Sequence, residues 1–579
     1  MERRVLIAVF LSFLVLYGYQ SFVAPRPPTA PVEALTPPPP ASTLPTPVAS
    51  SLVQATPTPV VEGSTAITVL GDTSARDITV ETATVLATLS NRGGRVIHWR
   101  LKDYRDSEGQ PVDLVPSALP VDQPTPFSLR VDDEVITKRL NEALYRVTGA
   151  PGDRIDVGAN GATVVFEFED ASGLRARKEF RFDRQNYLVT FSATAQDGDR
   201  SLNPVVLWGP GLGDIGALSG GGSSFTGNYS QPPQGIYNRD AKAERFTNEA
   251  IAEQPVHEGQ FRFAGIDDHY FLAVVLNPGQ TKIEFRALTI PLGQSTRSLV
   301  APSFTFAQSP QTTKFFYGPK QFDLLRSVDP ELVRAINFGF FGWLAVPLLG
   351  ALQWIYGFIG NYGWSIILLT MFISIAVSPL RHKSVVSMRK MQVVQPQMKA
   401  IQDRYAGLKA TDPARQKMNT EIMALYKEKG VNPAGGCLPM LLQFPVLLAF
   451  YSMLSQAIEL RGAEFGWWIR DLSQPDPYYV IPVLMAGTMF WQTKITPSTA
   501  DPAQQRIMMF MPLMFSVMFL WAPSGLVIYW FVSNLWAISQ QYFTNWMIGP
   551  APVSMARPAA ERQVKNVGAS RTGGASKRP

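Results

Sequence analysis

Residues 362–380 read YGWSIILLTMFISIAVSPL and carry no charged side chain. A helix of this length rises about 28 Å, which nearly crosses a hydrocarbon core of about 30 Å, so the stretch predicts a transmembrane helix. Thr370, Ser374 and Ser378 stand four residues apart and share one helical face, and Arg381 follows near that face. Either the hydroxyls bond back to carbonyls of their own helix, or they line a wetted groove inside a helix bundle, because polar stripes avoid lipid.

The composition of the whole chain is that of a membrane protein with a large soluble part. Of its 579 residues, 46% are hydrophobic and 17% are charged. A single cysteine, Cys437, excludes an internal disulfide framework. The four histidines do not cluster with Cys or carboxylates, and no zinc spacing, phosphate-binding glycine loop or nucleophile elbow occurs. We therefore expect no metal, no other cofactor and no covalent chemistry.

The chain begins with a basic pair and a long apolar run. The run has about 19 residues, longer than the apolar region of most signal peptides, so residues 1–24 predict an uncleaved transmembrane anchor with a cytoplasmic N-terminus. A cleaved signal peptide is the alternative interpretation. Residues 25–64 form a Pro-rich linker, because their composition cannot bury a core and favours extended chain.

Residues 65–318 predict an all-β sandwich domain. Short runs rich in Val, Ile, Phe and Tyr alternate with clusters of Gly, Asp, Asn and Pro, and the run TVVFEFED at 163–170 alternates apolar and acidic residues. Because one span precedes the domain, it lies outside the cytoplasm. A docking or scaffolding role is favoured over catalysis or glycan binding, since no acid pair or metal set is visible.

The distribution of charge predicts the topology of the second half. The loop after residue 380 carries 11 Lys/Arg and four Asp/Glu up to residue 429, so we place it in the cytoplasm as a helical hairpin over 381–435. Residues 319–360 are then an interfacial helix region rather than a span, because one more span would place the basic loop outside. The basic tail, 549–579, belongs inside, where its charge either binds ribosomal RNA weakly or serves only to set the topology. The basic hairpin is expected to contact anionic lipid headgroups or RNA.

Four further spans complete a core over residues 361–548. They are predicted at 437–457, 478–492, 507–521 and 526–543. The fourth and fifth spans of the chain have about 15 residues each, short for a core of about 30 Å, so local thinning of the bilayer is expected. Met511, Met514 and Met518 share one face of the fifth span, either as core filler or as a soft face for apolar client segments.

Two segments carry a resemblance to a known family. Residues 432–445, NPAGGCLPMLLQFP, resemble the third-span signature of the YidC membrane protein insertases, and residues 523–530, PSGLVIYW, followed by Ser533 and Asn534, resemble the sixth-span signature. The sequences GPK at 318 and DPYY at 476 also match. The resemblance is strong over about 318–547 and weak over the anchor and β domain, in the arrangement of the Gram-negative type.

The resemblance implies five core spans around a hydrophilic groove that opens to cytoplasm and lipid, and a periplasmic domain of the mutarotase-like β-sandwich kind. It implies the Sec translocon, ribosome-bound nascent chains and client membrane proteins as partners, and it assigns Thr370, Tyr529 and Trp530 to the groove. The family usually carries an arginine five residues before the proline of the first core span, whereas this chain has Ser374 there. The helical spacing adds further groove candidates, namely Ser374, Ser378, Arg381, Gln443, Ser533 and Gln540.

We therefore expect a membrane protein insertase and chaperone of the bacterial inner membrane, with both termini in the cytoplasm and residues 65–318 in the periplasm. Such a protein needs no small-molecule substrate and is not an enzyme. A secondary transporter is the alternative from another class, but it would need internal repeats and ionisable residues at the midplane, and the core spans carry no Asp or Glu. A periplasmic enzyme on an incidental anchor is the third possibility.

Overall fold

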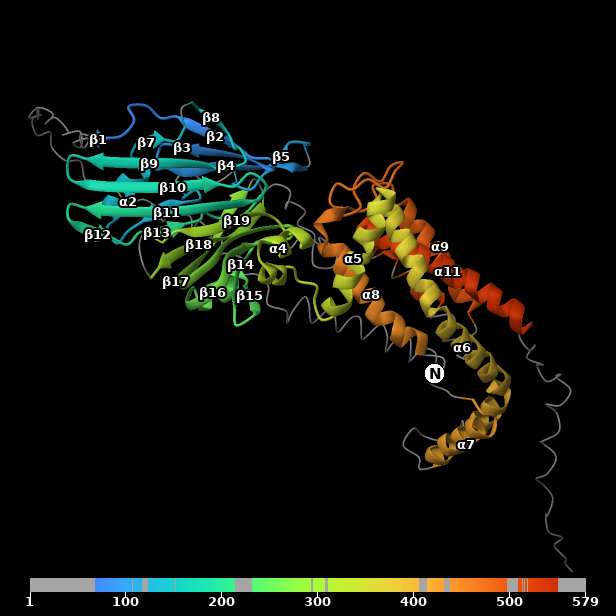
Figure 1. The fold of residues 1–579 in the computed structure, drawn as a ribbon. Coiled ribbons are helices and arrows are strands. Elements are labelled where there is room, and N and C mark those ends of the chain that lie inside the picture. The colour runs from blue at the N-terminus through green and yellow to red at the C-terminus, as the bar shows by residue number, and fades with distance from the viewer. Residues whose placement is uncertain are drawn as a thin grey trace, which may run out of the picture. The chain divides into compact units, whose positions relative to one another are not determined.

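The computed structural model describes residues 68–549, apart from 107, 117–122, 151, 214–231, 293–294, 308–310, 406–413, 432–437, 497–508, 513, 515 and 518. The predicted anchor, the Pro-rich linker and the basic tail after residue 549 lie outside the described residues. Among those that are described, strands occupy the first half of the chain and helices the second (Figure 1).

The strands form two sheets. The larger has 14 strands, ordered β1-β9-β10-β11-β19-β17-β16-β14-β15 along its main path, and the smaller has five, ordered β5-β4-β3-β2-β8. The strands are β1 Thr68–Leu70, β2 Asp77–Glu81, β3 Val85–Ser90, β4 Arg95–Arg105, β5 Pro111–Asp113, β6 Ser128–Arg130, β7 Arg146–Thr148, β8 Arg154–Asp156, β9 Ala162–Asp170, β10 Leu174–Phe182, β11 Leu188–Asp197, β12 Arg200–Leu202, β13 Val205–Leu207, β14 Gln234–Arg239, β15 Lys242–Phe246, β16 Val256–Asp267, β17 Phe271–Leu292, β18 Ser295–Phe306 and β19 Thr313–Pro319.

An aromatic core joins the two sheets. In β9 the apolar residues Val164, Phe166 and Phe168 are buried, as the alternation predicts. Trp99 of the smaller sheet donates from Nε1 to the carbonyl of Tyr317 in the larger at 2.8 Å, and their rings stack at 5.1 Å. The β-rich domain expected from the sequence is confirmed.

One buried cation is part of this core. The Nζ of Lys178, on β10, donates to the carbonyls of Gly93, Gly94 and Phe127 at 2.6, 3.2 and 2.8 Å. Burial lowers the pKa of Lys178 well below its usual value. Because three carbonyls satisfy its three donors, the lysine ties β10 to the turn before β4 and to the segment before β6, and has a structural role.

The helices follow β19, apart from two short ones inside the β domain. They are α2 Glu134–Glu142, α3 Asn248–Glu253, α4 Phe322–Val328, α5 Gly342–Ile359, α6 Tyr362–Arg404, α7 Ala414–Glu428, α8 Leu438–Gln456, α9 Val480–Ile495 and α11 Ser524–Ile548, with 3₁₀ turns η3 Pro330–Ala335, η5 Ile458–Leu460 and η6 Phe519–Trp521. Between α9 and η6, the described residues from 509 to 517 are helical.

Helix α6 is longer than the span predicted at its start. Asn361 caps it by accepting the backbone N–H of Trp364 at 3.1 Å, and the helix then runs for 43 residues through Pro379 and Pro396. A proline removes one backbone donor, but its fixed φ is compatible with a helix. The predicted first core span and the first half of the predicted hairpin are therefore one continuous helix.

By length and composition, α5 and α6 are the two described helices that could each cross a membrane. The interfacial placement of α5 thus stays a prediction from the topology. Helices α8, α9 and α11 cover most of the predicted spans at 437–457, 478–492 and 526–543, with ends that differ by up to five residues.

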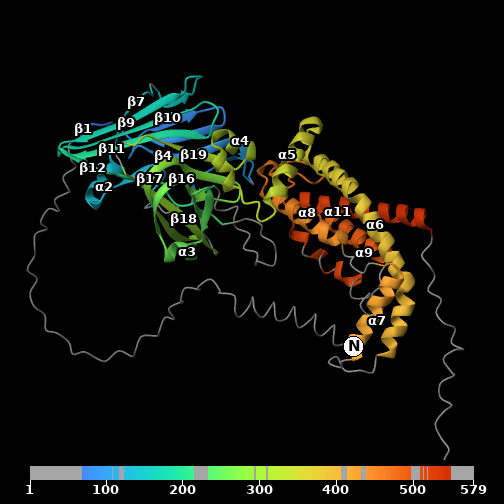
Figure 2. The ribbon, with the colours of Figure 1, turned by 60° about the horizontal axis from the view of Figure 1, so that its bottom comes forward.

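The second half of α6 and α7 pack as an antiparallel hairpin (Figure 2). Tyr405 donates from its hydroxyl to Glu421 at 2.8 Å, and Arg404 pairs with the same carboxylate at 3.3 Å. Nearer the base of the hairpin, the Tyr426 hydroxyl contacts the sulfur of Met398 at 3.0 Å. Asp412 and Pro413, a pair typical of the start of the second hairpin helix, lie outside the described residues.

Candidate hydrophilic groove

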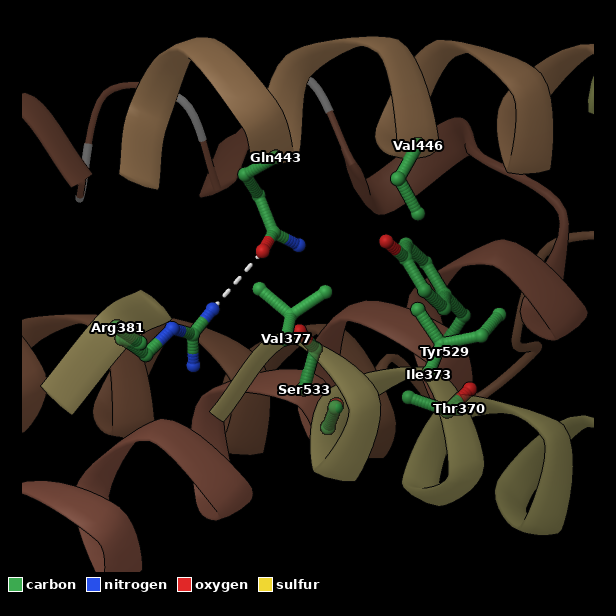
Figure 3. A pocket seen from close by; sticks show the side chains of 9 residues that line it. Thr370, Ile373, Val377, Arg381, Gln443, Val446, Tyr529 and Ser533 are labelled. Carbon is green, nitrogen blue, oxygen red and sulfur yellow. Dashed lines mark hydrogen bonds between the residues drawn. The ribbon is translucent and has the colours of Figure 1, made fainter. Parts of the chain in front are cut away.

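A hollow opens between α6, α8 and α11 (Figure 3). The space between its lining residues, together with its open mouth, amounts to about 310 Å³. We call it the polar hollow. Its lining residues are Thr370, Ile373, Ser374, Val377 and Arg381 of α6, Gln443 and Val446 of α8, and Tyr529 and Ser533 of α11.

Helical back-bonding accounts for two of the three hydroxyls in the α6 stripe. Thr370 donates from Oγ1 to the carbonyl of Ile366 at 2.6 Å, and Ser378 donates from Oγ to the carbonyl of Ser374 at 2.7 Å. Such bonds satisfy the donor but leave lone pairs on the hydroxyl oxygen free to accept. The two interpretations of the stripe are therefore compatible at Thr370, which both bonds back and lines the polar hollow.

One strongly polar contact crosses the polar hollow. Arg381 donates from Nη2 to the Oε1 of Gln443 at 2.9 Å. The other terminal nitrogen, Nη1, is buried and has no hydrogen-bond partner among the side chains that the structure describes. No carboxylate in the described part of the chain forms an ion pair with Arg381. The amide nitrogen of Gln443 points toward the hydroxyl of Tyr529 (Figure 3).

Tyr529 is held in place from α8. Its ring stacks on Phe450 with centroids 4.2 Å apart and planes 11° from parallel. Phe450 stands seven residues, or two helical turns, after Gln443, so both lie on the face of α8 that meets α11. The packing therefore fixes where the Tyr529 hydroxyl meets the polar hollow.

The structure separates some predicted residues from this site. Ser378 does not line the polar hollow; its hydroxyl accepts the indole N–H of Trp536 at 3.1 Å, and its carbonyl accepts the side-chain amide of Gln540 at 2.7 Å. Trp530 packs edge-on against Phe519, with ring centroids 4.8 Å apart. Ser378, Gln540 and Trp530 thus belong to the surroundings of the polar hollow and not to its wall.

The predicted methionine face is partly described. Met511 and Met514 are exposed side chains in this chain taken by itself, whereas Met518 lies outside the described residues. Their exposure fits a surface that meets lipid or an apolar segment better than core filler.

The apolar part of the wall was not among the predicted residues. Ile373 and Val377 of α6 and Val446 of α8 line the polar hollow beside the polar residues. Their spacing could have identified two of them. Val446 follows Gln443 by three residues and Val377 precedes Arg381 by four, so each valine lies on the same helical face as its polar neighbour. A search for polar stripes alone passes over them.

Comparisons with known proteins identify the family. The family model described as "60Kd inner membrane protein" matches residues 354–550, and the model "YidC periplasmic domain" matches residues 77–351. The membrane protein insertase YidC of Geobacter metallireducens is 32% identical over 575 residues, covering 95% of this chain and 99% of the relative. The chain belongs to the YidC family of membrane protein insertases.

A second relative agrees. The YidC insertase of Oleidesulfovibrio alaskensis is 34% identical over 94% of this chain and 99% of its own. Among solved structures, one described as an active YidC insertase with its first transmembrane domain resolved covers 83% of this chain and 95% of its own, at 18% identity and a TM-score of 0.34.

The family membership establishes what the molecule does. It is a membrane protein insertase of the inner membrane with a β-rich periplasmic domain, and its clients are membrane proteins. The resemblance stated from the two signature segments is confirmed, and the secondary transporter finds no support.

Proposed function

We propose that the polar hollow is the place where a client's hydrophilic segment enters the membrane. The observation that carries the proposal is the guanidinium of Arg381, which faces Gln443 across the polar hollow and has one buried terminal nitrogen. An ionisable side chain at the end of a predicted span, directed back into a polar lining, is typical of a functional pathway. Tyr529, Ser533 and Ser374 extend the polar lining on the same side.

The physical effect is a lower barrier for crossing. A polar group without a partner in hydrocarbon costs several kcal/mol, and a short hydrophilic tail carries many such groups. In the polar hollow, hydroxyls, an amide and a guanidinium replace part of the lost hydration, while the client's apolar segment leaves sideways into lipid. Members of the family usually carry a positive charge at the position of Ser374. In this chain Arg381 supplies the charge, two turns or about 10 Å further along α6. No covalent step is required.

The arrangement in the membrane belongs to the same proposal. We place six spans with both termini in the cytoplasm, α5 in the outer interface, and the β domain, of mutarotase-like type, in the periplasm. The Sec translocon, the ribosome and anionic lipids are the proposed partners. The charge of the hairpin supports the last two, because its Lys and Arg residues outnumber its acids.

Removing the polar lining tests the proposal. The variant with Thr370→Val and Ser374→Ala should slow insertion of a client with a short charged tail by about tenfold, since polar groups in the tail lose partners. Arg381→Glu should slow a client with an acidic tail more than one with a neutral tail. Purified protein is reconstituted in phospholipid vesicles, and insertion is measured by protection of the tail from protease.

The matched control is Ser539→Ala, because Ser539 also bonds back to its own helix but faces outward on α11. It should leave insertion unchanged. Normal insertion by both variants of the polar hollow would mean that the hydroxyls only bond back to carbonyls of α6, and the proposal would have to be abandoned.

A further inference from the structure

The bond between Arg381 and Gln443 joins two helices across the polar hollow. Arg381 comes from α6 and Gln443 from α8, and their side chains point toward one another from opposite walls (Figure 3). We propose that this pair is a latch, and that a carboxylate on the entering client opens it by taking the place of Gln443 on the guanidinium. The inference rests on the proposed function of the polar hollow.

The latch holds a cation with a neutral partner. A guanidinium binds a carboxylate in a two-pronged geometry, through charge-assisted hydrogen bonds about twice as strong as neutral ones. In the described structure Arg381 uses Nη2 for one amide oxygen, while Nη1 stays buried without a partner. A client carboxylate would engage both nitrogens, so exchange of the amide for the acid is favourable.

A second hydrogen-bond partner lies near Gln443 when a client displaces it from Arg381. Its amide nitrogen already points toward the Tyr529 hydroxyl, whose ring is fixed by stacking on Phe450. A small turn of the side chain therefore keeps Gln443 hydrogen-bonded after Arg381 has left it. An exchange that leaves no buried polar group unpaired avoids the penalty that would otherwise keep the latch closed.

The position of the latch determines what it controls. Arg381 lies just beyond Pro379, on the part of α6 that continues into the hairpin, and Thr370, Ser374 and Ser533 lie farther from the hairpin. A client that comes from the hairpin side meets the latch before it meets the hydroxyls. A client with an acidic tail therefore breaks the Arg381–Gln443 bond itself, whereas a client with a neutral tail enters only after that bond has broken spontaneously.

Two substitutions of Gln443 distinguish the latch from a role in which Gln443 only makes the polar hollow hydrophilic. Gln443→Glu gives Arg381 an internal carboxylate, so a client acid no longer has the advantage, and insertion of an acidic-tailed client should slow about tenfold. Gln443→Met has nearly the same shape but cannot accept, so a neutral-tailed client should insert faster than it does with the parent protein. Both clients are one single-span protein with an Asp-containing or Asn-containing tail, inserted into phosphatidylethanolamine/phosphatidylglycerol vesicles.

The control for added charge is Gln110→Glu, which places the same carboxylate on the exposed surface of the β domain and should leave both rates unchanged. Elution volume and thermal unfolding in detergent show whether each variant is folded, and Gln443→Met keeps the test decisive should Gln443→Glu not fold.

Two results would overturn the latch. One is an unchanged ratio of acidic to neutral insertion in a folded Gln443→Glu variant; the other is slower insertion of both clients by Gln443→Met, which would make Gln443 only a wetting group. If these variants behave as the parent while the Thr370/Ser374 variant is slow, the polar hollow remains the entry site and only the latch is wrong. If all are normal, both proposals fall.

Discussion

At the scale of single residues, Glu459 is an acid whose surroundings disfavour its charged form. It lies on the short turn η5 that follows α8. Gln353 of α5 donates to its Oε1 at 3.1 Å. Burial raises the pKa of Glu459 above its usual value, the nearby charge of Asp323 adds to this, and the hydrogen bonds from Gln353 and the Phe322 backbone oppose it. The folded protein therefore binds a proton at Glu459 more readily than the unfolded chain does.

The sign of the consequence follows from linkage. The cost of ionising Glu459 in the folded state is fully present above its folded pKa and disappears below the unfolded value of about 4.3. Glu459→Gln keeps an amide oxygen for Gln353 and removes the charge, so it should raise the thermal midpoint at pH 7.5 by roughly 2–4 °C. The difference from the parent should shrink as the pH approaches about 4.3. Unfolding in detergent at a series of pH values measures it.

Glu464→Gln serves as the control, because Glu464 is an exposed acid on the same loop. A midpoint for Glu459→Gln at pH 7.5 that is lower than the parent's would show that the carboxylate stabilises the fold.

The sequence predicts which residues share a helix face but not what meets that face. The spacing of Thr370, Ser374 and Ser378 puts them on one side of α6, yet Ser378 meets Trp536 while Ser374 meets the polar hollow. The difference arises because Trp536 and Gln540 of α11 reach Ser378, whereas Ser374 lies where α8 and α11 together border the polar hollow. The pairing of Arg381 with Gln443 likewise depends on the relative height of two helices, which neither helix encodes alone.

At the scale of elements, the end of α11 is fastened to α6. The guanidinium of Arg389 donates to the carbonyl of Gly549 and to the side-chain oxygen of Asn545, and Arg389 is only 7% exposed. Two turns nearer the polar hollow along α6, His382 contacts the Thr544 hydroxyl at 3.2 Å. A cation at the carboxyl end of a helix is also favoured by the helix dipole. These contacts fix the direction in which α6 continues toward the hairpin.

Removing this fastening should loosen the hairpin. Arg389→Ala should cost about 1–3 kcal/mol of stability, because it removes two hydrogen bonds to a charged group. It should also broaden the distribution of distances between spin labels on Met423→Cys of α7 and Ser539→Cys of α11, measured in a Cys437→Ser background.

The neighbouring cation gives a matched control, since Lys390 is exposed. Lys390→Ala should leave the distribution as narrow as the parent's. An equally narrow distribution in Arg389→Ala would mean that other contacts hold the hairpin.

Much of the element scale could be read from the sequence. Alternation predicted a β domain, and its last strand, β19, ends one residue past the predicted boundary at 318. Continuity of α6 was missed because the predicted span was ended before the first charged residue, Arg381, and the start of charged sequence marks the edge of a membrane and not the end of a helix. The division into sheets of 14 and five strands depends on pairings between distant segments, such as β11 with β19, which local patterns do not contain.

At the scale of the whole molecule, the distribution of Lys and Arg predicts which parts face which side. In a Cys437→Ser background, single cysteines at Asp199 of the β domain and Glu464 of the loop after α8 should react with an impermeant thiol reagent added to intact spheroplasts. A cysteine at Lys417 of α7 should react only after the membrane is opened. All three native side chains are exposed, so access depends on the membrane alone.

Reaction of the Lys417 cysteine in intact spheroplasts, together with protection of the Glu464 cysteine, would require a different number of spans. That result would also move α5 from the interface into the membrane as the additional crossing.

Because α6 is one helix of 43 residues, about 64 Å long, the wall of the polar hollow and the hairpin are parts of the same rod. Arg389 joins that rod to α11 between its two ends. In the proposed topology the hairpin lies in the cytoplasm, so a force applied to it there would be carried along α6 to the contacts of Ser378, Arg381 and His382 with α8 and α11.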